Sequence, residues 1–334
     1  MAAALGPLSL GEILDRTVQL YRRNFRLFAG IAVTPSAIVT AGYAVQIVLG
    51  QPAGTGRHSP LHFAFFSFVE LLLTLVVGAY SHAAFTSAAV DIHLGRPVTF
   101  HAAAFRILPR YWRFLRLSAL QWLIVLGIPC GVAIVAAIPV VILGTIFAGS
   151  APATAAGVTV ALTFAAFMGP AIWLLSRVAL AVAVCWVEDK TAWASIKRAS
   201  ALSKAARGRV AMAYVFFYAI FGITIALRLS ILAAVGAYPI HAAHHLAGAQ
   251  LLLDRIFEIL YSFATETLLT PLAPTALAIL YIDQRVRKEG FDIDWMMYQA
   301  GLHVPQTPPV RPAVPTAPAP SSMPLPDPAT VKEP

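Results

Sequence analysis

The sequence predicts an all-α, polytopic membrane protein with six transmembrane helices. Of its 334 residues, 59% are hydrophobic and only 12% are charged, whereas soluble domains carry roughly a quarter of charged residues. The mean hydropathy is +0.75, which places the chain among integral membrane proteins. Six apolar segments are also long enough to cross a bilayer, which takes ~20 residues. These segments are residues 28–50, 61–90, 117–147, 154–187, 209–237 and 251–282.

A segment of one recurring type precedes the first, third and fifth span. Each opens with a helix-capping residue, Ser9, Thr99 or Thr191, and Glu12 follows Ser9 at the spacing of a capping box. Apolar residues on one face and basic residues on the other predict an amphipathic helix in the membrane interface. We therefore expect three repeats of one interfacial helix plus a two-span hairpin, at residues 8–90, 98–187 and 190–283. The alternative is that basic amphipathic linkers occur in any multispan protein.

The basic residues set the expected orientation. Twenty of the 24 Lys and Arg residues lie in four segments, 1–27, 91–116, 188–209 and 283–334. The positive-inside rule makes these segments, and both termini, cytoplasmic. Because the bilayer accounts for the net charge of +9, we expect anionic lipid head groups as partners and no nucleic acid. A membrane-protein partner or a second copy of the chain is a further candidate. The expected head-group anchors are Arg22, Arg23, Arg26, Arg110, Arg113, Arg116, Arg285, Arg287 and Lys288.

Charged residues inside the spans are candidates for function, because charge within lipid is costly. Glu70, Arg228 and Glu266 fall at a similar outer depth of spans 2, 5 and 6. We expect Arg228 to pair with one of these glutamates, either to fix helix register or to line a polar cavity open to the outside. Arg177 lies near the middle of span 4, where carbonyls freed at Gly169–Pro170 could receive its guanidinium.

The segment "YIDQRVRKEGFDIDWM" closes the last span. Its basic residues are expected to anchor the helix end, and Gly290 to stop the helix. Its acidic residues carry the wrong charge for lipid, so we expect them to pair with the basic helices near Arg22, Arg113 or Arg207. These acidic residues are Asp283, Glu289, Asp292 and Asp294. The rest of the chain, residues 301–334, is proline-rich and is expected to be a disordered cytoplasmic tail after a membrane domain of residues 1–300.

The sequence contains no motif for catalysis or for a cofactor. Phosphate-binding loops, nucleophile elbows and paired CxxC motifs do not occur in it. His241, His244 and His245 cluster in an outer loop, but no carboxylate or thiolate flanks them closely, so solvated polarity explains them better than a metal site. We expect no enzymatic activity, no metal and no cofactor.

The chain resembles the bacterial membrane family labelled glycerophosphoryl diester phosphodiesterase membrane domain. The resemblance rests on "LSLGEILDRTVQLYRRNFRLFAGIA", "ILYIDQRVRKEGFDIDWM" and, less closely, "VEDKTAWASIKRASALSKAARGRV", and it spans residues 8–297. It implies a multi-pass protein of the bacterial plasma membrane. Some members are fused to a phosphodiesterase barrel with an "HRG" sequence, which this chain lacks, so the resemblance provides no catalytic residues.

These observations favour a non-catalytic membrane protein that acts as a scaffold, an assembly factor or a regulator. The alternative is a small transporter or lipid-handling protein that uses the polar residues of spans 2, 4, 5 and 6. An intramembrane enzyme would need paired catalytic carboxylates on the cytoplasmic side, and the sequence shows none. A closed, well-packed bundle would support the first hypothesis, and a deep cavity that reaches Arg177 the second.

Overall fold

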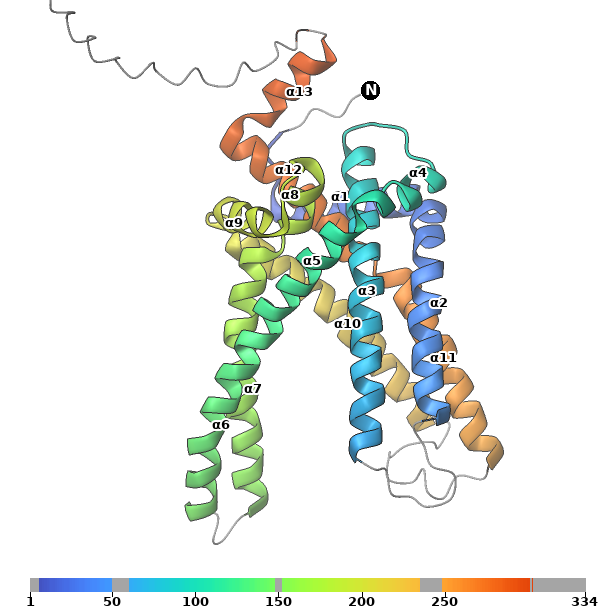
Figure 1. Ribbon diagram of the computed structural model, residues 1–334, viewed down its shortest axis with the longest axis vertical. Helices are drawn as coiled ribbons and strands as arrows, with labels where there is room; N and C mark the ends of the chain where they lie inside the picture. Colours follow the sequence, from blue (N-terminus) through green and yellow to red (C-terminus); the bar gives the residue numbers. More distant parts are fainter. Residues whose placement is uncertain (1–5, 50–59, 148–151, 235–247, 301, 303–334) are drawn as a thin grey trace, which may run out of the picture. The chain divides into compact units, whose positions relative to one another are not determined.

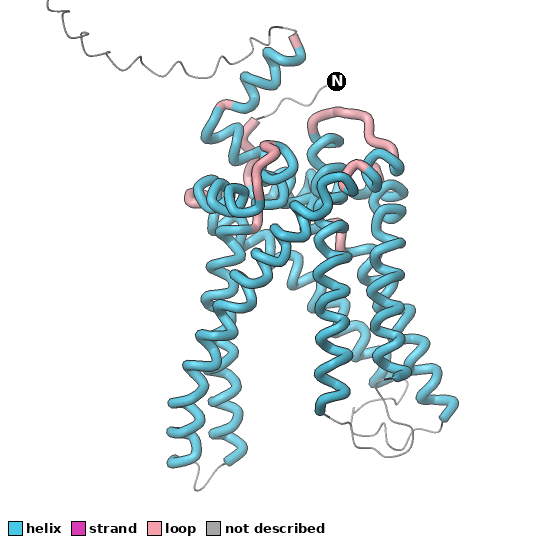
Figure 2. The backbone as a smooth tube through the Cα atoms, viewed as in Figure 1, coloured by secondary structure: helices cyan, strands magenta, loops and turns pink. Residues whose placement is uncertain are grey.

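The computed structural model describes residues 6–49, 60–147, 152–234, 248–300 and 302. Every regular element in these residues is a helix (Figures 1 and 2). Six segments of the described chain are long and apolar enough to cross a membrane, which confirms the predicted class. The segments are Phe25–Gln46, Ala64–His93, Phe100–Pro139, Val160–Val187, Arg207–Ile231 and Arg255–Glu289. The predicted tail and the histidines at 241–245 lie outside the described residues, apart from Leu302.

The first repeat begins with helix α1 (Leu10–Arg23). The predicted capping box is present: the Ser9 amide donates to Glu12 Oε2 (2.6 Å), and the Glu12 amide donates to Ser9 Oγ (3.3 Å). The backbone hydrogen bond from Ser9, and then that from its side chain, lower the pKa of Glu12. Helices α2 (Phe25–Leu49) and α3 (Pro60–His93) form the hairpin that follows.

The apolar face of α1 lies against protein. Ile13, Thr17 and Leu20 are buried, and α1 packs on α12, α10, α2 and α3. Val18 on the same helix and Phe25 just after it stay exposed, so contact of this face with the membrane interface remains a prediction. The helix is amphipathic because it covers the end of the helical bundle, while Arg22 and Arg23 remain exposed.

The second repeat begins with a broken linker. Thr99 caps α4 (Phe100–Phe105) through a hydrogen bond from the Ala102 amide. The predicted single amphipathic helix then stops at Phe105, because Pro109 has no backbone N–H to donate to the Phe105 carbonyl; Pro109 lies instead in the short 3₁₀ turn η1 (Leu108–Arg110). Helix α5 (Tyr111–Trp122) starts afresh and continues into the third span.

The third and fourth spans form a hairpin of α6 (Ile128–Phe147) and α7 (Pro152–Val178). A π-helical turn, η2 (Leu123–Gly127), joins α5 to α6. This wide turn ends two residues before Pro129. The Pro129 nitrogen has no hydrogen to donate, and its ring crowds the preceding turn of a regular α-helix. After α7, the short α8 (Ala181–Val187) completes the fourth span.

The third repeat consists of α9 (Ala192–Ser203), α10 (Arg207–Ala234), α11 (Gly248–Leu269) and α12 (Leu272–Glu289). Thr191 occupies the N-cap position of α9, but its side chain makes no capping bond. The predicted sixth span is two helices, because the chain turns at Thr270 and Pro271. Gly290 ends α12 with a positive φ of 64°, as expected for a left-handed cap. Helix α13 (Phe291–Gln299) follows.

The most buried part of the bundle is where α3, α8 and α12 meet. Small side chains such as Ala84, Ala88 and Ala278 are fully buried there and allow close helix packing. The hairpin of α6 and α7 differs, because these helices pack chiefly on each other and expose apolar side chains, as lipid-facing helices do. Backbone contacts divide the chain into residues 1–292 and 293–334; the domain boundary near residue 300 stays a prediction.

Candidate functional site

Three of the four polar residues predicted inside the membrane line one cavity of about 260 Å³. Glu70 comes from α3, Arg228 from α10 and Glu266 from α11. We call this space the polar cavity. It is also lined by hydroxyl-bearing residues: Tyr43, Thr224, Tyr261, Ser262 and Thr265.

Arg228 pairs with Glu258. The predicted pairing of Arg228 with Glu70 or Glu266 is wrong. The distance from Arg228 Nη2 to Glu258 Oε1 is 2.5 Å. Glu258 also accepts hydrogen bonds from Tyr43 Oη (2.5 Å) and from Arg255 Nη1 (3.3 Å). Glu258 also lines the polar cavity.

Among the described residues, the carboxyl groups of Glu70 and Glu266 have no hydrogen-bonding partner. Neither forms a hydrogen bond or an ion pair within the part of the chain that the structure describes. They are close enough to interact electrostatically with each other. The polar cavity therefore combines one neutralised arginine with two carboxyl groups whose hydrogen-bonding capacity is unused.

Two further cavities meet the polar cavity at Glu266 and Phe221, which line all three. One, of about 260 Å³, lies between α2 and α3 and contains Ser36, Ser81 and His82 in its wall. The other, of about 290 Å³, lies between α10, α11 and the start of α12. We call the latter the apolar cavity, because aromatic and aliphatic side chains dominate its wall. These side chains are Phe217, Tyr218, Ile220, Phe221, Leu269 and Leu272.

Arg177 lies outside this group of cavities, because it lines none of the three. Its guanidinium carbon lies 4.4 Å from the centre of the Trp173 ring, one helical turn earlier in α7. This cation–π contact is the partner that the structure assigns to Arg177, in place of the carbonyls predicted at Gly169–Pro170. Span 4 is therefore not part of the candidate site.

A second polar region lies where the even-numbered spans end, beside α1, α4 and α9. We call this side of the bundle the linker end. Each hairpin ends there on a carboxylate that binds basic groups. Asp91 at the end of α3 pairs with Arg96 (3.3 Å) and Arg106 (2.6 Å). Asp189, after α8, pairs with Arg110 (2.9 Å) and Arg113.

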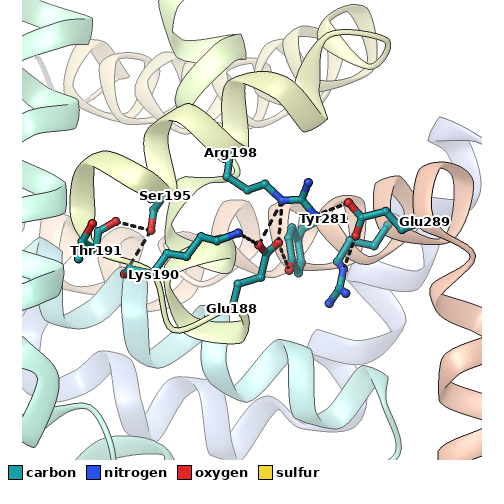
Figure 3. A network of polar contacts seen from close by, with 8 residues as sticks. Glu188, Lys190, Thr191, Ser195, Arg198, Tyr281 and Glu289 are labelled. Carbon is teal, nitrogen blue, oxygen red and sulfur yellow. Dashed lines mark hydrogen bonds and ion pairs between the residues drawn. The ribbon is translucent and has the colours of Figure 1, made fainter. Parts of the chain in front are cut away.

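Glu188, next to Asp189, is the centre of the network in Figure 3. It accepts from Lys190 Nζ (2.5 Å), Arg198 Nε (3.1 Å) and Tyr281 Oη (3.1 Å). Burial opposes ionisation of Glu188, but these hydrogen bonds and the positive charge of Arg198 outweigh it and lower its pKa. Arg198 also pairs with Glu289 of α12, so the network joins α9 to α12.

Asp283 in α12 is the most enclosed of these carboxylates, with 2% of its surface exposed. Its oxygens accept from the Leu8 amide (2.8 Å), Arg209 Nη1 (2.7 Å), Gln284 Nε2 (2.9 Å) and Arg287 Nε (3.0 Å). Asp283 and Glu289 do bind basic residues of the third linker, Arg209 and Arg198, but the partners named in the prediction were Arg22, Arg113 or Arg207. For Asp292 and Asp294 such pairing stays a prediction.

The nine expected head-group anchors divide into two sets. Arg22, Arg23, Arg26 and Arg116 are exposed, although Arg116 Nε also donates to the Trp112 carbonyl. The other five are bound by protein. Arg110 and Arg113 bind Asp189, Arg285 binds Glu289, Arg287 binds Asp283, and Lys288 Nζ donates to the Ala201 and Leu202 carbonyls at the end of α9.

Periodicity could have identified Glu258 from the sequence. Glu258, Ser262, Thr265 and Glu266 follow one another at helical spacing, so they share one face of α11 and all line the polar cavity.

Within the described residues, no group of three or more His, Cys, Asp or Glu side chains could hold a metal ion. No family model, curated protein or solved structure matches this chain.

Proposed function

We propose that this protein binds an amphipathic, lipid-like molecule without transforming it, in the polar and apolar cavities that meet at Glu266. The observation that carries the proposal is that Glu266 and Phe221 line a cavity with polar groups and a cavity with apolar walls at once. A ligand with a polar head and an alkyl chain would match both.

The surroundings of the two cavities support a lipid-like ligand over a small solute. Large apolar side chains are exposed on the outer surface of α10 beside them, including Leu227 (55%) and Ile223 (67%). These side chains are expected to face hydrocarbon, so a membrane-dissolved molecule would reach the apolar cavity without crossing water. This proposal develops the lipid-handling alternative and excludes Arg177 from it.

We also propose that the protein is a multi-pass protein of a bacterial plasma membrane with both termini in the cytoplasm. The concentration of basic residues at the linker end supports this orientation. The membrane-domain family named above remains the proposed relationship, and it rests on the quoted segments alone.

A second candidate function is a scaffold or regulator that uses the linker end. It is favoured by two exposed tryptophans there, Trp112 in α5 (68%) and Trp193 in α9 (55%). Exposed tryptophan is typical of contact with a partner or with the membrane interface.

A cavity-filling substitution tests the lipid-binding proposal. Ser262→Phe places an aromatic ring in the polar cavity, whereas Ala264→Phe changes an exposed position of the same helix. The purified, delipidated protein is incubated with dioctanoyl phospholipids carrying ethanolamine, glycerol or choline head groups, and retained lipid is counted by native mass spectrometry. We expect retention of at least one of these lipids by the wild type and Ala264→Phe and its loss in Ser262→Phe. No retention by the wild type, or equal retention by all three proteins, contradicts the proposal and leaves the scaffold hypothesis.

A further inference from the structure

The charges of the polar cavity do not balance. Arg228 is the only basic residue among its described lining residues, and Glu258 already neutralises it at 2.5 Å. Glu258 also pairs with the positively charged Arg255 and accepts a hydrogen bond from Tyr43. Glu70 and Glu266 are left with no counter-charge among the described residues, in a region where a lone ionised carboxylate is strongly disfavoured.

We infer that the polar head of the bound molecule carries an amine, which lies between Glu70 and Glu266. This inference rests on the proposed function and specifies the ligand class of the same site. An ammonium group has three donors and no acceptor. The two carboxyl groups, with the hydroxyl groups of Ser262 and Thr265 in the same wall, provide the acceptors for those donors.

Other polar heads fit less well. An anionic head would meet two carboxyl groups and an arginine that is already paired, so repulsion would exclude it. A bare divalent metal is disfavoured because the described residues contain no group of three or more metal-binding side chains. A neutral alcohol could enter while both carboxyl groups are protonated, but its single O–H donor would replace the three donors of an ammonium, and it would not compensate an ionised carboxylate.

The test uses one alkyl chain with different heads. Dodecylamine, dodecyltrimethylammonium, dodecyl phosphate and dodecanol are titrated into the full-length protein in nanodiscs of phosphatidylcholine, and binding is measured by isothermal titration calorimetry. We expect dodecylamine to bind about tenfold or more tightly than dodecanol, because hydrogen bonds to charged groups are the strong ones. The trimethylammonium head should bind less tightly than the amine, because it has no N–H donor. Ethanolamine shows whether the site accepts the amine head without a chain.

Two variants assign the preference to the carboxyl groups. Glu70→Gln and Glu266→Gln, combined in one protein, keep the size of both side chains and remove their charge. The preference for dodecylamine over dodecanol should disappear in this variant and persist in Asp15→Asn, which changes an exposed residue of α1. Thermal melts of all three proteins show whether each one is folded.

The outcomes separate this inference from the proposed function. If the dodecyl compounds bind, Ser262→Phe abolishes their binding and the amine has no advantage, the cavity binds amphiphiles and the amine inference is overturned. A preference for amine that survives in the double glutamine variant also overturns it. If none of the compounds binds, both proposals fail. If ethanolamine alone binds as tightly as dodecylamine, the amine assignment stands and the lipid-like nature of the ligand is contradicted.

Discussion

The amide of Leu8 donates a hydrogen bond to Asp283 Oδ1 at 2.8 Å across 275 positions of the sequence. Arg287 strengthens this link, because its Nη2 donates to the Leu8 carbonyl (2.7 Å) while its Nε binds Asp283. Arg209 at the start of α10 completes the junction. The N-terminal segment, the fifth span and α12 are thus held together by one buried carboxylate.

Removing this carboxylate should destabilise the protein. Asp283→Ala leaves Arg209 and Arg287 without their counter-charge, and loss of one partner from a buried ion pair costs on the order of 3 kcal/mol. Unfolding in detergent, followed by tryptophan fluorescence during a denaturant titration, measures the change. Asp15→Ala removes an exposed carboxylate that, among the described residues, binds only Gln19, and it should have little effect. Equal stability of the two variants would show that the junction contributes nothing.

The network around Glu188 should make stability depend on pH. Because the folded-state pKa of Glu188 is lowered below its ordinary value of 4.5, the stabilisation is fully present above that ordinary value and is lost as the pH falls through the lowered pKa. Arg198→Ala removes the main positive charge, so the pKa of Glu188 should rise and acid unfolding should begin at a higher pH. Lys197→Ala, at an exposed neighbouring position, is the control. An unchanged acid transition in Arg198→Ala would contradict the assignment.

The capping residues of α1 and α9 should differ in their contribution to the free energy of unfolding. Ser9 makes both bonds of a capping box, so Ser9→Ala should lower the free energy of unfolding by about 1 kcal/mol. Thr191 makes no side-chain capping bond, so Thr191→Ala should be nearly neutral. Thermal melts in the same detergent compare the two variants. A larger loss for Thr191→Ala would be inconsistent with the described caps.

Cysteine labelling should reveal the orientation. Lys204→Cys lies at the exposed linker end, and Leu61→Cys lies at the opposite end of α3 with 82% of Leu61 exposed. In a background of Cys130→Ala, which removes the exposed native thiol, a membrane-impermeant maleimide should label Lys204→Cys only in inside-out vesicles. It should label Leu61→Cys only in right-side-out vesicles. The reverse pattern would contradict a cytoplasmic linker end.

Much of the fold follows from the sequence because hydrophobic length and basic charge act over whole segments. Hydrophobic length predicts the six spans. The Ser and Thr residues that open the linker segments predict the caps at Ser9 and Thr99. The points at which a helix ends inside a span are harder to predict, because a proline in a long helix can be tolerated or can end the helix. Pro35, Pro139 and Pro170 all lie inside helices, whereas the chain turns at Pro271. Only the packing of neighbouring helices decides between these outcomes.

The sequence predicted three residues that line the candidate site, but not which glutamate forms the ion pair with Arg228. Glu70, Arg228 and Glu266 line one cavity as their similar depth suggested, yet the partner of Arg228 is Glu258. Depth counted from an uncertain span end carries an error of several residues, and a single helical turn is ~5 Å. Glu258 and Glu266 are ~12 Å apart along α11, so an error of about two helical turns is enough to exchange one glutamate for the other.

The bond between Leu8 and Asp283 also has a consequence for biogenesis. During synthesis the N-terminal segment emerges first, and Asp283 is added only when nearly all of the membrane-embedded chain has been made. Until then the Leu8 amide and the guanidinium of Arg209 lack their acceptor. A chain that stops before α12 therefore leaves these groups without the acceptor that Asp283 provides.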